Sequence, residues 1–143
     1  MYAAISPSES RSGNAELVAP HRWSDGAAEV SFAWTDDETR LRHLYQSDPC
    51  RVLFPRQADG APKEAVIVTT SGGIVGGDRL RFEIEAGPGC AAVVTTQAAE
   101  KIYRSTGANA EINVSVRAHD RALLEWIPQE TILFEGARLR RRT

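Results

Sequence analysis

The stretch AVIVTTSGGIVGGDRLRFEIEAGPGCAAVVTTQAAEKIYRS, from Ala65 to Ser105, decides the fold of this chain. It contains an apolar strand, a glycine-rich turn, an alternating strand, a second turn and a polar segment, in that order. In the first turn, two glycine pairs enclose Ile74 and Val75, and Asp78 follows. Such pairs indicate backbone with positive φ, or backbone too close to a neighbour for a Cβ atom. We therefore expect a structural turn made by Gly72, Gly73, Gly76 and Gly77.

The glycine-rich turn does not fit a nucleotide site. A phosphate-binding P-loop has Lys and then Ser or Thr directly after its last glycine, whereas Asp78 and Arg79 follow Gly77 here. A dinucleotide-binding turn opens a helix, and an alternating strand follows this one. Asp78 can instead accept hydrogen bonds from the turn amides, or it can contribute a carboxylate to a site at the end of the sheet.

Residues 79–86 have the clearest strand pattern, because apolar and charged side chains alternate along RLRFEIEA. Gly87-Pro88-Gly89 then turns the chain into a return strand over 91–95. We expect this turn to pair the two strands antiparallel, which would bring Asp78 close to Gln97 and Glu100.

The rest of the chain repeats short apolar or alternating runs between turn signals. Ala98–Tyr103 is expected to form a single helical turn or an irregular bend, and no helix of normal length is predicted. The pattern predicts an all-β fold of stacked antiparallel or mixed sheets, either β-helix-like or a sandwich. Further strands are predicted over 29–34, 39–45, 50–54, 65–68, 112–118, 122–127, 131–134 and 137–142.

The length of 143 residues fits one domain. Residues 1–28 are rich in Ser, Pro, Ala and Gly without a period and are expected to form a mobile leader, so that 29–143 make a single all-β domain. The chain ends at Thr143 within a predicted strand, which favours a domain that is truncated at its C-terminal end.

Composition gives no electrostatic case for nucleic-acid binding, since the net charge is −2 with 25% charged residues. Cys50 and Cys90 are far apart and lack CxxC or Cys/His spacing, so neither a disulfide framework nor a zinc ribbon is predicted. No signal peptide or membrane-spanning run is present in the sequence, and a cytoplasmic location is expected.

The sequence predicts a non-enzymatic protein. It contains neither a GxSxG elbow nor an HExxH motif, and His21, His43 and His119 are isolated from one another. A jelly-roll metalloenzyme would need two histidines on neighbouring strands. Near the C-terminus, Arg138, Arg140 and Arg142 are expected on one solvated strand face, whereas Arg141 shares the face of Leu139 and has no predicted role.

Three motifs, GGIVGGD (72–78), TTQAAEKIYRS (95–105) and LEWIPQETILFEGARLRRR (124–142), resemble the UreD (UreH) family of urease accessory proteins. The resemblance implies a mostly β fold with a stacked, helix-like arrangement of sheets. It also implies a urease maturation factor, a scaffold that binds the urease structural subunits before they hold metal, recruits UreF and through it the GTPase UreG, and helps carry Ni²⁺ to the urease active site. No cofactor would be bound tightly, and Ni²⁺ would be in transit through a polar passage.

Polar residues around the predicted hairpin end supply a candidate lining for such a passage. Carboxylate and amide oxygens can coordinate a divalent ion loosely, with water completing the shell. Asp78 and Glu100 are the candidate transient metal ligands, and the candidate lining residues are Thr95, Thr96, Gln97 and Lys101. The alternative is a non-enzymatic β-sandwich that binds a ligand, in which Asp78 is only a structural turn residue.

Overall fold

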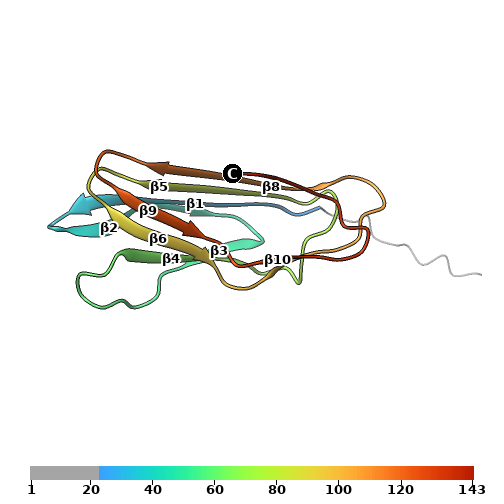
Figure 1. The fold of residues 1–143 in the computed structure, drawn as a ribbon, viewed down its shortest axis with the longest axis horizontal. Coiled ribbons are helices and arrows are strands. Elements are labelled where there is room, and N and C mark those ends of the chain that lie inside the picture. The colour runs from blue at the N-terminus through green and yellow to red at the C-terminus, as the bar shows by residue number, and fades with distance from the viewer. Residues whose placement is uncertain (1–22) are drawn as a thin grey trace, which may run out of the picture.

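The computed structural model describes residues 23–143, and every regular element in that range is a β-strand. Two long sheets lie face to face as layers, with their strands along the long axis of the molecule (Figure 1). The strands are β1 (Asp25–Thr35), β2 (Glu38–Gln46), β3 (Cys50–Leu53), β4 (Lys63–Thr69), β5 (Arg79–Ala86), β6 (Ala91–Thr96), β7 (Glu100–Ile102), β8 (Ala110–Ala118), β9 (Leu123–Ile127), β10 (Thr131–Leu133) and β11 (Leu139–Arg142).

The strands form three sheets, named A, B and C here. Sheet A has the order β11-β8-β5-β1-β2, sheet B the order β3-β4-β6-β9, and sheet C consists of β10 and β7. The neighbours β1 and β2 pair antiparallel, as do β3 and β4. All other strand pairs of residues 23–143 are parallel. The mixed sheets confirm the predicted fold class.

From β5 onward the chain winds as a coil. In its first turn the chain forms β5 in sheet A, β6 in sheet B and β7 in sheet C. In its second turn it forms β8, β9 and β10, which pair with β5, β6 and β7 in the same three sheets. Glu111 consequently lies beside Arg79, and Leu123 beside Ala91, each one coil later in the sequence. The β-helix-like arrangement, the first of the two predicted alternatives, describes this part of the chain.

The predicted hairpin of β5 and β6 is wrong. The two strands belong to different sheets, and β5 pairs with β1 and β8 instead. Gly87-Pro88-Gly89 forms a corner whose amides bond to neighbouring coils, since Gly87 N–H donates to Phe32 O (2.9 Å) and Gly89 N–H to Asp120 O (3.0 Å). The turn therefore connects the end of β5 in sheet A to the start of β6 in the facing sheet B.

The expectation of a helical turn or irregular bend at Ala98–Tyr103 holds only at its start, where the chain bends at Ala98. Glu100–Ile102 is the strand β7, which pairs parallel with β10. Ile102 is fully buried, and its other neighbour is Ile74 in the preceding coil, through a parallel bridge. A third side of the coil thus closes the space between the ends of sheets A and B.

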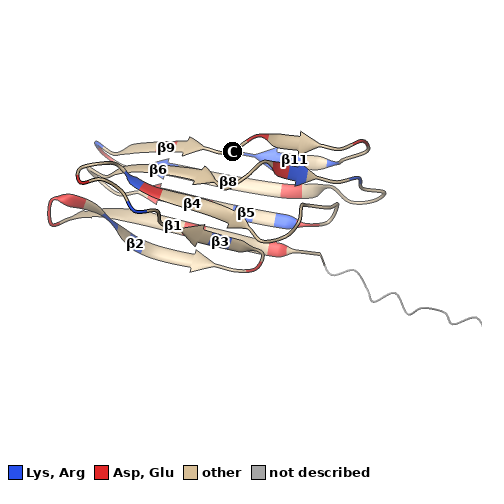
Figure 2. Cartoon of the chain, turned by 90° about the horizontal axis from the view of Figure 1, so that it is seen from below, with Lys and Arg blue, Asp and Glu red and all other residues tan. Residues whose placement is uncertain are grey.

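The hydrophobic core lies between sheets A and B. Alternate residues of β4, β5 and β6 point inward, so the even-numbered residues of β5 are buried while its four charged residues face outward. Phe82, Ile67 and Val94 are almost completely buried, and each such side chain contributes about 1.5–3 kcal/mol relative to an exposed position. The outer faces differ, because β6 carries no charged residue and β4, β6 and β9 are mostly uncharged along their length (Figure 2).

The first strand begins at Asp25, so it includes the last residues of the segment predicted as a leader, and Ala27 and Ala28 are buried in it. Residues 1–22 of that predicted leader, with His21, lie outside the described residues. Across residues 23–143, no helix has the length and apolar character that a membrane crossing requires.

Candidate functional site

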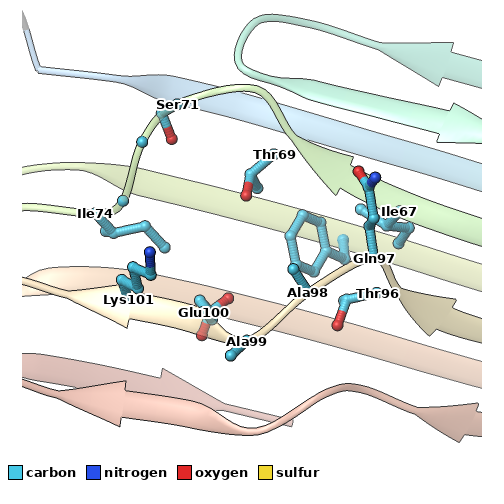
Figure 3. A pocket seen from close by; sticks show the side chains of 13 residues that line it. Ile67, Thr69, Ser71, Ile74, Thr96, Gln97, Ala98, Ala99, Glu100 and Lys101 are labelled. Carbon is cyan, nitrogen blue, oxygen red and sulfur yellow. The ribbon is translucent and has the colours of Figure 1, made fainter.

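A cavity of about 270 Å³ opens at the corner where sheet B gives way to sheet C. We call it the corner cavity. Ile67, Ile74 and Phe82 form its apolar side. Its polar lining comes from two segments, as Figure 3 shows, with Thr69 and Ser71 from the end of β4 and beyond, and the rest from β6 to β7. The polar and charged side chains that line it are Thr69, Ser71, Thr96, Gln97, Glu100 and Lys101.

The parallel pairing of β4 and β6 brings these segments together. Ile67 lies beside Thr96, and Gln97 N–H donates to Ile67 O (3.1 Å). Because β4 and β6 run in the same direction, the segments that follow them leave sheet B at the same end. The residues that follow each strand therefore face a common space.

Glu100 is the carboxylate of the corner cavity, and its side chain is only 12% exposed. It forms an ion pair with Arg141 of β11 and accepts a hydrogen bond from Thr131 Oγ1 of β10 (3.5 Å). Arg141 Nη1 also donates to Thr131 Oγ1 (3.0 Å). Three strands of different sequence position thus meet at this carboxylate.

A second cavity, of about 50 Å³, adjoins the corner cavity at Glu100. It shares Phe82, Thr96 and Glu100 with the corner cavity, and Arg141 lines it as well. Glu100 therefore belongs to the walls of two neighbouring cavities.

Asp78 does not line the corner cavity. It is 5% exposed, and its Oδ1 accepts a hydrogen bond from Ser24 N–H (2.7 Å) while Oδ2 accepts one from Val75 N–H (2.9 Å). The expectation that Asp78 lies close to Gln97 and Glu100 loses its basis, because the β5–β6 hairpin does not form, and Asp78 does not share their cavity. The main-chain partners are those expected of a structural turn residue.

Three of the four candidate lining residues line the corner cavity, and Thr95 does not. Thr96, Gln97 and Lys101 line the corner cavity (Figure 3). Thr95 is not among its lining residues, because alternation turns it away from the inward-facing Val94 and Thr96. Its hydroxyl donates instead to Ile127 O of the neighbouring strand (2.6 Å).

The four glycines of the turn differ in how much space a Cβ atom would have and in their φ angle. A Cβ on Gly76 would lie 1.9 Å from Ser105 Oγ and 2.3 Å from Ala108 O. Gly77 has φ of +99°, and a Cβ there would meet the Trp23 ring at 2.5 Å. Gly73 has its own close neighbour in the ring of Tyr103, whereas Gly72 has open space around it.

The sequence reasoning missed Thr69, Ser71 and Phe82 as cavity residues, and gave Arg141 no role. The sequence pattern could have identified Phe82, since it belongs to the inward face of an alternating strand. It could also have identified Arg141, because Arg141 shares a strand face with Leu139. No sequence pattern identifies Thr69 and Ser71, because only the pairing of β4 with β6 places them.

The described residues contain no group of three or more His, Cys, Asp or Glu side chains placed to hold a metal ion. Burial raises the pKa of the Cys50 thiol to about 11, and burial also raises the pKa of Cys90. Both thiols stay protonated near neutral pH and are poor metal ligands. The corner cavity offers one carboxylate, which is already paired with Arg141, together with neutral oxygens and the Lys101 ammonium, so a cation could contact it only loosely.

The outer face of sheet A has a broad depression of about 500 Å³ that includes several carboxylates. These carboxylates have cationic or imidazole partners: Glu29 pairs with Arg81 (3.0 Å), and Glu85 contacts His119 Nε2 (2.8 Å). The depression is therefore a paired, solvent-exposed surface of the sheet.

Comparison with known proteins identifies relatives along nearly all of the described chain. The family model "UreD urease accessory protein" matches residues 24–143. The chain is 48% identical over 124 residues to the urease accessory protein UreD of Magnetococcus marinus, covering 87% of this chain and 43% of that protein. It is 46% identical over 123 residues to the UreD of a Chelativorans species, covering 86% of this chain and 44% of the relative.

A third relative, the UreD of Brucella suis, is 41% identical over 126 residues, which cover 88% of this chain and 45% of the relative. The chain therefore spans less than half the length of these curated relatives. The matched description is that of an accessory protein, which agrees with the prediction that the chain is not an enzyme.

Proposed function

This chain belongs to the UreD family of urease accessory proteins, and on that premise we propose that it is a urease maturation factor that works as a scaffold. In this role it binds the urease structural subunits, recruits UreF and through it UreG, and assists the incorporation of nickel. The observation that carries the proposal is the family match over residues 24–143, which contain both the coil and the corner cavity.

The outer face of sheet B supports a scaffold role. Leu53, Leu123 and Ile127 are more than half exposed there, and the outward residues of β4 and β6 include Val66, Val68 and Val93. An exposed apolar sheet face of this kind is a common feature of protein interaction surfaces. The outer face of sheet A is charged by contrast, so the two faces of the molecule are suited to different neighbours.

The corner cavity supports a transient contact with nickel. Thr96, Gln97 and Glu100 provide oxygen atoms at its wall, and the number of protein ligands is too small for tight binding of Ni²⁺. Lys101 stands at the exposed rim of the cavity. These residues are proposed as the lining of a nickel passage, with Glu100 as its metal-contacting carboxylate.

Co-purification with the urease structural subunits, with and without UreF, tests the proposal. The 143-residue chain and a version extended to the length of its relatives are compared. We expect Leu123→Lys with Ile127→Lys to weaken capture of urease, because charge is introduced into the apolar face. Ser115→Lys, on the outer face of sheet A, is the matched control and should leave capture unchanged.

Capture of urease by neither version would contradict the scaffold function. The alternative of a ligand-binding β protein, with the corner cavity as its site, would then be preferred. Capture by the extended version alone would assign the urease contact to sequence beyond these 143 residues.

A further inference from the structure

Arg141 is a partly exposed arginine whose guanidinium pairs with the largely buried carboxylate of Glu100. In β11 it lies on the same face as Leu139, whereas Arg140 and Arg142 are on the opposite face. Its side chain is 32% exposed and reaches from the edge of sheet A to Glu100 and Thr131 on the two strands of sheet C. The guanidinium therefore connects sheet A to sheet C at the exposed edge of β11.

The contact between Arg141 and Glu100 lies at the boundary between the two cavities. The corner cavity and the smaller cavity share Glu100, and Arg141 lines only the smaller one. The cavities also share Phe82 and Thr96, and an ion that moved between them along the Glu100 carboxylate would meet the Arg141 guanidinium. Arg141 is thus placed where it can obstruct that route.

The charges around the corner cavity also indicate that Arg141 blocks Glu100. Of its lining residues, only Glu100 and Lys101 are charged, and Glu100 is already neutralised by Arg141. A divalent cation entering the cavity would meet no unpaired carboxylate among its lining residues. It could coordinate Glu100 only by taking the place of the guanidinium.

We propose that Arg141 is a gate residue, which holds the Glu100 carboxylate closed and must release it before a divalent cation can bind in the corner cavity. The proposal rests on the nickel passage proposed above and names the residue that controls it. Release is sterically simple, because β11 is the edge strand of sheet A and the Arg141 side chain already reaches solvent. Thr131 steadies the closed state, since its hydroxyl bonds to both partners.

Titration calorimetry of the purified 143-residue chain with Ni²⁺ alone tests the gate. Arg141→Gln keeps a hydrogen-bond donor near Glu100 and removes the positive charge. We expect it to bind one Ni²⁺ at least about tenfold more tightly than the unsubstituted chain, because a full opposing charge is gone. Arg141→Lys, which keeps the charge, should stay close to the unsubstituted chain. Arg140→Gln on the outer face is the matched control and should also show no gain.

The gain must depend on Glu100. Adding Glu100→Gln to Arg141→Gln should abolish it, and a gain that persists in the double variant would overturn the proposal. Unchanged binding in Arg141→Gln, or an equal gain in Arg140→Gln, would overturn it as well. The readout requires no urease, so loss of the scaffold function and loss of the gate are separate outcomes.

A second variant covers the case in which Arg141→Gln does not fold, as checked by far-UV circular dichroism. Thr131→Val leaves both charges in place and removes the hydroxyl that bonds to Arg141 and Glu100. We expect about fivefold tighter Ni²⁺ binding, the equivalent of one lost hydrogen bond in the closed state. No change in Thr131→Val, with Arg141→Gln unfolded, would contradict the gate.

Discussion

Asp78 and Glu100 are two inward-facing carboxylates held in different ways. Asp78 bonds to the main-chain N–H groups of Ser24 and Val75, and Glu100 bonds to the side chains of Thr131 and Arg141. Main-chain donors cannot leave without a change in the fold, whereas a side chain can rotate away. Burial alone therefore does not decide whether a carboxylate is a structural group or an exchangeable one. The mobility of its hydrogen-bond partners decides this.

The two corners also differ in packing. The Asp78 turn is closed by glycines that touch backbone and side chains of the next coil, and the Glu100 corner is hollow. We expect substitutions in the first corner to change the stability of the fold, and substitutions in the second to change it little.

Gly76→Ala should have the largest effect. The added Cβ would lie 2.3 Å from the carbonyl oxygen of Ala108, a main-chain atom that cannot move aside without displacing the coil. We expect a loss of more than about 4 kcal/mol of folding free energy, enough to abolish a cooperative unfolding transition. Urea unfolding followed by circular dichroism measures it. A folded variant with an unchanged midpoint would show that the turn can open.

Asp78→Ala should have the next largest effect. It leaves the N–H groups of Ser24 and Val75 without their carboxylate acceptors. We expect about 2–4 kcal/mol of destabilisation, since hydrogen bonds to a charged group are each worth about 1.5–3 kcal/mol. Asp59→Ala, in an exposed loop, is the control for loss of one negative charge. Equal midpoints for the two variants would remove the structural role assigned to Asp78.

The strands themselves were largely predictable from the sequence. The alternation over RLRFEIEA predicted a strand at 79–86, and β5 has those bounds. Its partners were not predictable, because alternation shows that one face is buried and leaves open which strand lies beside it. A Gly-Pro-Gly turn between two strands that each have one buried face is compatible with a hairpin and with a corner between two sheets. The expected position of Asp78 beside Gln97 and Glu100 depended on the hairpin and lost its support with it.

The candidate site was predictable only where it depends on local sequence. Thr96, Gln97 and Lys101 line the corner cavity because a polar segment follows an apolar strand. Thr69 requires knowledge that β4 lies beside β6. Arg141 was recognised as unusual for its strand face, but its partner Glu100 is 41 positions away in the sequence, and no local pattern connects them.

Glu100→Gln should destabilise the fold less than Asp78→Ala. The substitution removes the charge partner of Arg141, whose side chain is partly exposed and can be hydrated instead. We expect a loss of about 1 kcal/mol or less, because a solvent-accessible ion pair contributes little. The same urea titration measures it. A loss as large as that of Asp78→Ala would mean that the Arg141 contact is structural, and the distinction between the two carboxylates would fail.

Gly72→Ala should have the smallest effect, and with the opposite sign. Nothing lies within 4 Å of a Cβ added at Gly72, which borders the corner cavity, and its φ is not in the left-handed region. Alanine therefore fits the folded chain and restricts the unfolded one, which should stabilise the protein by about 0.4–1 kcal/mol. The same substitution at Gly76 is expected to unfold it. A small rise in the urea midpoint would support a hollow, tolerant corner at Glu100, whereas clear destabilisation would show that this corner is as tightly packed as the turn at Asp78 and has no room for a passing ion.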